Sequence, residues 1–266
     1  MGNGILRYIK IYRILLMQDI KGKMHFSVDF LISILGIIIT NFSGALSLWI
    51  IFDKVNMLNG WSYYEMLYFY GFSILSIAPS SLFFDNVWNI SRMVHTGDFI
   101  KYCFRPVNIL FYYISEVFNI TALSDVIFGS VILIYSIYHL NLKITFLGII
   151  SFILILICSS LIMSGILILA SATAFWIYNC HSVLIFVNKF KDFSRYPVTI
   201  FRGFFKVFIS FIIPIAYISY YPSLLFLDGF FSSSLALLTP IVGIIFFLVS
   251  CKVWLIGAYS YEGTGN

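Results

Sequence analysis

The sequence predicts an all-α integral membrane protein with six transmembrane helices and an amphipathic helix at its N-terminal end. Three observations lead to this prediction. Of the 266 residues, 61% are hydrophobic and only 10% are charged, and the mean hydropathy is +0.99, far outside the range of a soluble domain. Six apolar runs are long enough to cross a bilayer, which takes about 20 residues. The basic residues are distributed unevenly between the loops that join these runs.

The first 25 residues are expected to form a cytoplasmic amphipathic helix. Ile5, Ile9 and Tyr12 recur at helical spacing on one face, and Arg7 and Lys10 lie on the opposite face. A helix of this kind lies flat on a membrane surface, with its apolar face toward the lipid.

The six apolar runs follow in order along the chain. The third and the fourth are longer than one crossing requires, so they are expected to tilt or to project beyond the bilayer. An even number of spans places both termini on one side of the membrane. The expected spans are Phe26–Phe52, Tyr63–Phe84, Val107–Tyr138, Ile144–Ile177, Phe204–Tyr220 and Leu235–Trp254.

The distribution of positive charge indicates which side is cytoplasmic. With the N-terminus inside, only Lys54 and Lys143 lie outside, and the other 14 of the 16 Lys and Arg residues lie on the inner side. This bias predicts cytoplasmic termini. The net charge of +5 is therefore a topology signal that favours contact with anionic membrane lipids, and it does not indicate a nucleic-acid partner.

The whole chain, residues 1–266, is expected to form a single transmembrane domain. Two further segments between its spans have a predicted location relative to the membrane. Residues 178–203 are expected to form a cytoplasmic amphipathic segment, with Lys191 and Arg195 on its water-facing side. Residues 221–234 are apolar but too short to cross, so they are expected to re-enter the membrane from the outer side.

Sequence motifs of an enzyme are absent from the chain. The four histidines are scattered, and neither a His-Glu-x-x-His metal motif nor a Gly-x-Ser-x-Gly nucleophile motif occurs. The four cysteines have no spacing typical of a metal site, and free thiols are expected. A Gly-x-x-x-x-Gly-Lys-Ser/Thr phosphate loop is also missing, so work driven by ATP requires another subunit.

Residues 85–106, between the second and third spans, are expected to form a compact cytoplasmic elbow. Gly97 permits a left-handed turn that ends one helix, and the carboxylate of Asp98 is suited to cap the next helix. A short helix from Phe99 to Phe104 is expected to follow. Pro106 then suits the first turn of the third span. Alternatively, this segment is only a cationic loop that fixes the topology.

Two acidic residues stand out in the third span. Glu116 is ten residues past Pro106, which on a continuous helix places it about 15 Å into the membrane. Asp125, nine residues later, then lies on the opposite helix face. A carboxylate at this depth costs about 2.5–3.5 kcal/mol on insertion scales, so each should face protein or water.

Two interpretations of these acids remain open. Opposed polar faces suggest packing between two helical surfaces, one of them on a partner chain. In the alternative interpretation, Glu116 and Asp125 pair with Asn119, Thr121 or a neighbouring helix. Glu116, Asn119 and Asp125 are thus candidates for a substrate path or an interface.

Four short stretches together resemble one known family. They are Gly60-Trp61-Ser62 with Glu65 and Leu67-Tyr68; Gly97-Asp98-Phe99 followed by Arg105-Pro106; Phe193–Pro197 with Ile212–Tyr217 and Tyr221-Pro222; and Trp254–Gly257 with residues 259–263. In this order they resemble the outer-loop, elbow, fifth-span and terminal motifs of type-2 ABC exporter permeases, in particular a bacterial family of uncharacterised ABC-type permeases.

The resemblance implies an ABC type-2 exporter-like fold in a bacterial plasma membrane. Two permease chains, identical or related, would work with two cytoplasmic ATP-binding cassette subunits, which carry the ATP and Mg²⁺; no cofactor is expected on this chain. The elbow would be the coupling helix, with Phe99 as an apolar contact for the ATPase. The residues expected to couple the ATPase to the membrane helices are His95, Gly97, Asp98, Phe99, Lys101, Arg105 and Pro106.

Three functions are compatible with these features. The favoured one is the permease subunit of an ATP-driven exporter that moves a drug, peptide or lipid-like substrate outward by alternating access. The second is an intramembrane lipid-modifying enzyme that uses Glu116 or Asp125 as an acid or base. The third is a non-catalytic membrane scaffold or immunity protein.

Overall fold

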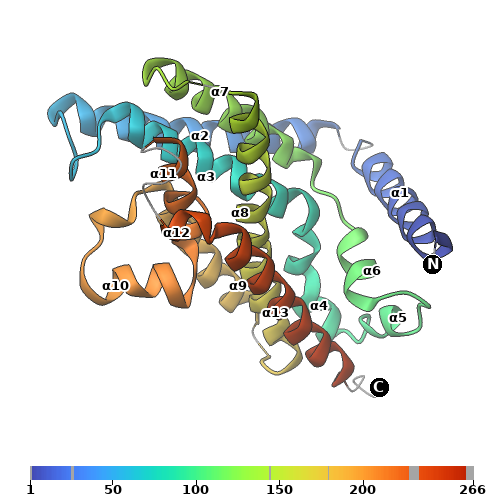
Figure 1. Ribbon diagram of the computed structural model, residues 1–266. Coiled ribbons are helices and arrows are strands. Elements are labelled where there is room, and N and C mark those ends of the chain that lie inside the picture. Colours follow the sequence, from blue (N-terminus) through green and yellow to red (C-terminus); the bar gives the residue numbers. More distant parts are fainter. Residues whose placement is uncertain (1, 25–26, 144, 179, 228–233, 262–266) are drawn as a thin grey trace.

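The computed structural model describes residues 2–24, 27–143, 145–178, 180–227 and 234–261. Within these ranges, all regular secondary structure is helical. Five helices are long and apolar enough to span a membrane, and a bent pair of shorter helices brings the number to six at most. The predicted all-α membrane fold is therefore confirmed (Figure 1).

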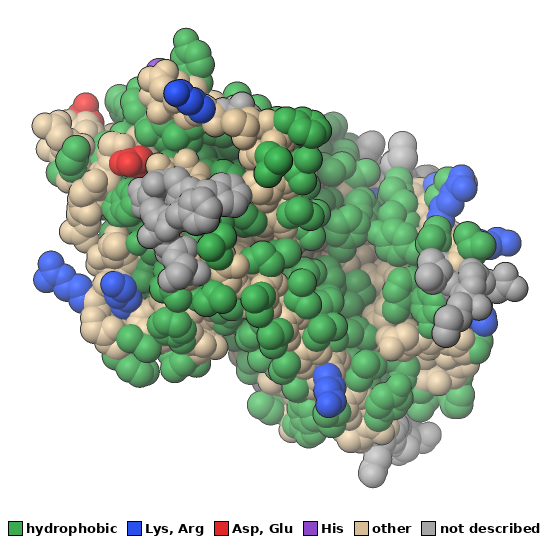
Figure 2. All heavy atoms as spheres, in the orientation of Figure 1, with side chains coloured by type: hydrophobic (Ala, Val, Ile, Leu, Met, Phe, Trp, Pro, Cys, Tyr) green, Lys and Arg blue, Asp and Glu red, His purple; other side chains and the backbone are tan. Residues whose placement is uncertain are grey.

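Helix α1 (Gly2–Met24) contains the predicted amphipathic segment. It lies beside a later helix, α6 (Ile109–Ser115), where the ring of Tyr8 contacts that of Phe111 at 4.8 Å and its hydroxyl accepts a hydrogen bond from the backbone N–H of Asn108 at 3.2 Å. Figure 2 shows mainly apolar side chains over the middle of the molecule and Lys and Arg side chains near α1 and α10, at its edges. The position of α1 on a membrane surface stays a prediction.

Helix α3 (Tyr63–Phe83) is the centre of the bundle, and most of its residues are buried. It packs against α2 (Ser27–Lys54), α7 (Leu123–His139) and α8 (Phe146–Ala172). By contrast, the side chains of α2 are mostly exposed. The last long helix, α13 (Thr239–Tyr259), runs along α8 (Figure 1). Gly243 permits their close approach, because a Cβ there would lie 2.3 Å from the carbonyl oxygen of Cys158.

The predicted third span is not one helix. After the elbow elements η1 (Asp85–Asn89), α4 (Ile90–His95) and α5 (Ile100–Cys103), α6 ends at Ser115. The short 3-10 helix η2 (Ile120–Ala122) then leads into α7. In the break, the N–H of Phe118 donates to Asp19 at 2.9 Å and its carbonyl accepts from Lys23 at 2.7 Å. Side chains of α1 thus satisfy backbone groups that a continuous helix would pair internally.

Residues 180–200 form α9 (Cys180–Lys189), η4 (Phe190–Arg195) and η5 (Val198–Ile200), and they run along α3 in the opposite direction. The ring of His181 lies against that of Trp88, just beyond the C-terminal end of α3, with 6.1 Å between the ring centroids. The hydroxyls of Ser194 and Ser73, near the middle of α3, are 2.6 Å apart. Trp61, just before α3, donates to Thr199 at 2.8 Å.

This path differs from the surface location expected for residues 178–203. A segment that contacts both ends of a spanning helix extends over the same depth as that helix. The difference arises because the polar side chains of this segment face a cavity between helices, described below, and a helical pattern of polar residues does not distinguish such a cavity from bulk water.

The predicted fifth span, Phe204–Tyr220, is also broken. Helix α10 (Gly203–Val207) continues into a π-helical turn, Phe208–Ile212, and after Pro214 the chain resumes as η7 (Ile215–Tyr217) and α11 (Tyr220–Leu227). The two arms are bent by 65°, since proline has no N–H to donate and its ring disrupts the preceding turn. Ser219 donates to the carbonyl of Phe69 at 2.9 Å, which fixes α11 beside the N-terminal part of α3.

The predicted re-entrant segment 221–234 is described only at its two ends. Its beginning belongs to α11, and its last residue is the first residue of α12 (Ser234–Leu237). Residues 228–233 of that segment lie outside the described residues. The sixth predicted span is confirmed as α13, although it begins at Thr239 rather than Leu235. Pro240 explains this start, because proline suits the first turn of a helix.

Candidate functional site

The elbow contains the predicted left-handed turn but not the predicted cap. Gly97 has a φ of +81°, as expected for a glycine that ends a helix. Asp98 does not cap α5; its carboxylate instead accepts a hydrogen bond from the hydroxyl of Thr96 at 2.6 Å. Short polar side chains often bond within a turn in this way, in competition with capping. The α5 helix lies within the predicted Phe99–Phe104 helix but is shorter.

Pro106 lies outside the next helix. Helix α6 begins at Ile109, and Asn108 is its cap, with the side-chain oxygen accepting from the N–H of Phe111 at 3.0 Å. The prediction that Pro106 forms the first turn is therefore wrong. An asparagine two residues later competes successfully for the N-terminal position because its side chain satisfies an unpaired backbone donor.

Phe99 is buried, and it is not available as the exposed contact that the sequence predicts. Its exposed fraction is 0%. The rings around it come from α5, α6, η3 (Thr173–Phe175), α13 and the residue pair that follows α13. They form an aromatic socket of Tyr102, Tyr113, Phe175, Trp254 and Tyr261, at centroid distances of 5.1 to 6.1 Å from Phe99.

The exposed apolar side chains near the elbow are others. Phe104 is 80% exposed and Ile100 is 40% exposed. Tyr178, in the loop after α8, is 83% exposed. Its ring lies against that of His95, with 4.3 Å between the ring centroids, and its carbonyl oxygen forms a hydrogen bond with the His95 ring. We call Ile100, Phe104 and Tyr178 the elbow surface. The sequence signal that could have indicated the exposure of Phe104 is its position next to the charged Arg105.

Glu116 belongs to the elbow and not to the middle of a span. It follows the last residue of α6, where its carboxylate accepts a hydrogen bond from the hydroxyl of Tyr102 and one from Lys101 at 3.2 Å. Burial, and then the Glu116 carboxylate, raise the pKa of Tyr102, so the phenol stays protonated as a donor. The continuous helix from Pro106, on which the predicted depth of about 15 Å was based, is not observed.

Arg105 also has a partner within the elbow. Its guanidinium lies 5.3 Å from the centre of the Tyr112 ring. Both predicted cationic contacts, Lys101 and Arg105, are therefore engaged with neighbouring side chains of this chain, which positions them without burying them.

Asn119 stabilises the restart of the helix after the break. Its side-chain oxygen accepts from the N–H of Thr121 at 3.2 Å and from the Thr121 hydroxyl at 2.5 Å. Burial raises the pKa of nearby Asp85, while the polar side chain of Asn119 and the charge of Lys23 partly offset that increase.

Asp125 pairs with a neighbouring helix, which was one of the two interpretations left open. Its carboxylate accepts a hydrogen bond from the side chain of Asn41, on α2, at 2.6 Å. The hydroxyl of Tyr70 donates to the carbonyl of Asn41 at 2.8 Å and holds that residue in place. Glu116 and Asp125 thus have separate partners within one chain, and their predicted opposed positions on one helix are not observed.

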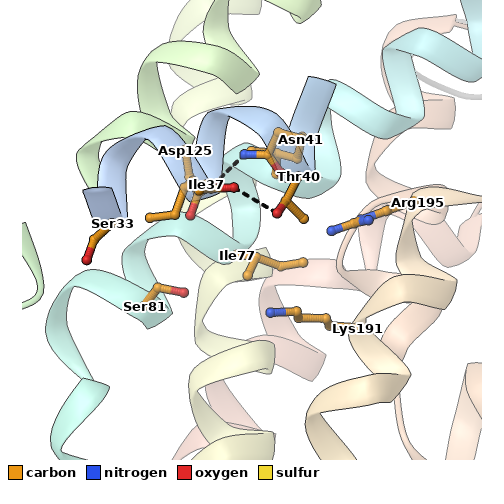
Figure 3. A pocket seen from close by; sticks show the side chains of 11 residues that line it. Ser33, Ile37, Thr40, Asn41, Ile77, Ser81, Asp125, Lys191 and Arg195 are labelled. Atoms are coloured by element: carbon orange, nitrogen blue, oxygen red, sulfur yellow. Dashed lines mark hydrogen bonds between the residues drawn. The ribbon is translucent and has the colours of Figure 1, made fainter. Parts of the chain in front are cut away.

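A cavity of about 500 Å³ lies beside Asp125, between α2, α3, α7 and η4. Figure 3 shows Asp125 and Asn41 on one wall and Lys191 and Arg195 pointing in from the other. A second cavity of about 240 Å³ shares Asp125 and Lys191 with the first and also includes Asn119. Two of the three predicted substrate-path residues, Asn119 and Asp125, therefore line neighbouring cavities, whereas Glu116 lines neither of these two.

Sequence reasoning missed Lys191 and Arg195 as cavity residues and placed them in bulk water. The available signal was the stretch Phe193–Pro197, which contains Arg195 and carries part of the family resemblance. Among the described residues, His, Cys, Asp and Glu form no group of three that could hold a metal ion.

Comparison with known families decides the class of protein. A family model described as ABC-2 family transporter protein matches residues 35–265. The chain belongs to the ABC-2 transporter family. As an ABC-2 protein it is a permease subunit of an ABC transporter and a multi-pass plasma-membrane protein. ABC-2 permeases are typically non-catalytic and generally work with an ATP-binding subunit. No curated protein and no solved structure matches the chain.

Proposed function

We propose that this ABC-2 permease exports a drug, peptide or lipid-like substrate, with ATP and Mg²⁺ bound by a separate cytoplasmic cassette subunit that contacts the elbow. The observation that carries the proposal is the burial of Phe99. Its socket joins the elbow to α6 through Tyr113, to α13 through Trp254, and to η3, directly after α8, through Phe175.

This packing gives a physical route for coupling. Packed interiors deform little, so a displacement of the elbow is transmitted to the helices that contact Phe99. The elbow surface of Ile100, Phe104 and Tyr178 lies outside this packing, free to contact a cytoplasmic subunit. A bundle with two arrangements, biased by ATP binding, is the minimum that alternating access requires.

The distribution of Lys and Arg residues still supports cytoplasmic termini when residues 180–200 are assigned to their observed path along α3. Lys189, Lys191 and Arg195 then lie along the bundle, as does Lys206, because Phe205 and Phe208 on either side of it contact Phe193 and Phe190 of η4. Lys54, Lys143 and Arg202 lie toward the end that carries Trp61. The larger group remains on the side of α1 and the elbow, as the positive-inside rule requires. It consists of Arg7, Lys10, Arg13, Lys21, Lys23, Arg92, Lys101, Arg105 and Lys252.

A second permease chain, identical or related, completes the proposed transporter. The exposed apolar side chains of α2, among them Leu35, Phe42 and Trp49, support this part of the proposal, because a helix that is buried little by its own chain is available to lipid or to another chain. The argument from opposed acids on one helix no longer supports it, since both acids have partners within the chain.

The test is purification of the tagged permease from its native membrane in mild detergent. We expect an ATP-binding cassette subunit to be recovered with it, and we expect a reconstituted complex of the two to hydrolyse ATP. A Phe104→Asp variant, with a charge on the elbow surface, should lose the subunit while it remains in the membrane. Turnover of a lipid by the permease alone, without any ATPase, would contradict the proposal and favour an intramembrane enzyme.

A further inference from the structure

The side chain of Lys191 is a cation that makes no hydrogen bond and no ion pair in the part of the chain that the structure describes. Its side chain points into the 500 Å³ cavity between α2, α3, α7 and η4 (Figure 3). No hydrogen bond or ion pair joins it to a described residue. A charged side chain at the depth of a membrane span is costly, and such residues usually mark a functional site.

Arg195 points into the same cavity four residues later. Its guanidinium lies 3.4 Å from the carboxylate of Asp192 and 5.5 Å from the centre of the Tyr70 ring. These contacts hold the side chain in place, but the buried Nε–H has no hydrogen-bond partner among the described residues. A donor without a partner in a buried site is costly unless a ligand or water completes it.

The acid in this cavity is already engaged on the opposite wall. Asp125 accepts from Asn41 at 2.6 Å, and no ion pair joins it to Lys191 or Arg195 in the described residues. The lining of this cavity thus carries two cations on the η4 side and one hydrogen-bonded carboxylate across from them. An anion bound next to η4 would contact both cations, while Asp125 would keep its hydrogen bond to Asn41.

The remaining lining determines the rest of the ligand. Ile37 on α2 and Ile74 and Ile77 on α3 give the cavity an apolar side next to the cations. A small inorganic anion would leave this apolar surface uncovered, whereas an alkyl chain would cover it, which is favourable because it removes apolar surface from water. The cavity therefore combines a cationic end with an apolar wall.

We propose that this cavity binds the phosphate or carboxylate headgroup of an anionic amphiphile, with Lys191 and Arg195 as the anion-binding residues and the alkyl chain along the isoleucines. This inference deepens the proposed function by naming the substrate class of the exporter. The binding site itself stands without the ATPase, so its test uses the permease chain alone.

The test is a direct binding measurement on the purified full-length chain in an uncharged detergent. The probes are dodecyl phosphate, inorganic phosphate and dodecyltrimethylammonium. We expect saturable binding of dodecyl phosphate to the wild type and about tenfold weaker binding to Lys191→Met, because that variant lacks a charged hydrogen-bond donor to the headgroup; tenfold corresponds to about 1.4 kcal/mol. Lys191→Arg should retain binding.

Three controls make the outcome decisive. Lys189→Met, an exposed cation in the same segment, should bind like the wild type. Asp125→Asn should not weaken binding, because the acid is not part of the anion site. Inorganic phosphate should compete poorly; if it competes as well as dodecyl phosphate, the site is for a free anion and the amphiphile is rejected.

Equal binding to the wild type and to a monodisperse Lys191→Met variant would overturn the proposal. So would equal binding of dodecyltrimethylammonium, or loss of binding in Asp125→Asn. If Lys191→Met fails to fold, equal binding of dodecyl phosphate to the wild type in low and in high salt would overturn the proposal, because binding through charge is screened. A chain that binds dodecyl phosphate but never associates with an ATP-binding subunit would leave this site in place and reject the exporter function.

Discussion

The indole N–H of Trp61 donates to the hydroxyl of Thr199 at 2.8 Å, although 138 residues separate them in sequence. Trp61 lies in the loop before α3, and Thr199 lies at the end of the segment that begins at Cys180, near the other end of α3. This bond therefore places residues 199–203 on the same side as the α2–α3 loop. The topology derived from sequence alone places them on the opposite side.

Thiol labelling in intact cells distinguishes the two topologies. In a background without native cysteines, Arg202→Cys should react with an impermeant thiol reagent, as should Asn59→Cys and Asn141→Cys in the loops that both topologies place outside. Cys103, retained as a single cysteine, should stay protected, because it lies in the elbow. Labelling of position 202 only after permeabilisation would contradict the structure.

Phe99 and Phe104 should respond differently to truncation. Phe99→Ala removes a fully buried ring, and such changes cost about 3–5 kcal/mol in a packed core, so lower membrane abundance and a lower melting temperature in detergent are expected. Phe104→Ala removes an exposed ring and should leave both unchanged while it weakens association with the ATP-binding subunit. The reverse pattern would reject both the socket and the elbow surface.

Glu116 should stabilise the elbow chiefly through Tyr102. A hydrogen bond to a charged group is worth about 1.5–3 kcal/mol, so Glu116→Gln and Tyr102→Phe should each lower the free energy of unfolding, measured by titration with sodium dodecyl sulfate. Lys101→Met should cost less, because its ion pair with Glu116 is part-exposed and such pairs contribute about 0–1 kcal/mol. If the effects of Glu116→Gln and Tyr102→Phe add fully in the double variant, the two side chains are not coupled.

Asp85 should make stability depend on pH in a defined direction. Burial raises its pKa in the folded state above the ordinary value of 3.8. The protonated form is therefore favoured by folding, and its contribution to stability is complete below 3.8 and is lost as the pH rises through the raised pKa. Asp85→Asn should melt at a higher temperature than the wild type at pH 7.5 and lose this part of the pH dependence. A lower melting temperature at pH 7.5 would contradict this assignment.

Several features of the protein follow from the sequence by itself. The long apolar runs give α2, α3, α8 and α13, and the spacing of apolar residues near the N-terminus gives α1. The turn at Gly97 was predicted from local chemistry, since glycine adopts a positive φ at little cost. Membership in the ABC-2 family, first suggested by short motifs in order, is confirmed by a match over most of the chain.

The tertiary structure alone decided the features that depend on distant partners. The break before α7 is held by Asp19 and Lys23, which contact Phe118 from 99 and 95 residues away, so no local pattern marks it. Phe99 is buried by rings from other helices, whereas its local sequence resembles that of an exposed turn. Lys191 and Arg195 have the periodicity of a solvated helix face. Only the packing of η4 against α3 turns that face toward a cavity. Amphipathic spacing shows that a side chain is polar, but it does not show where the water or ligand that satisfies that side chain lies.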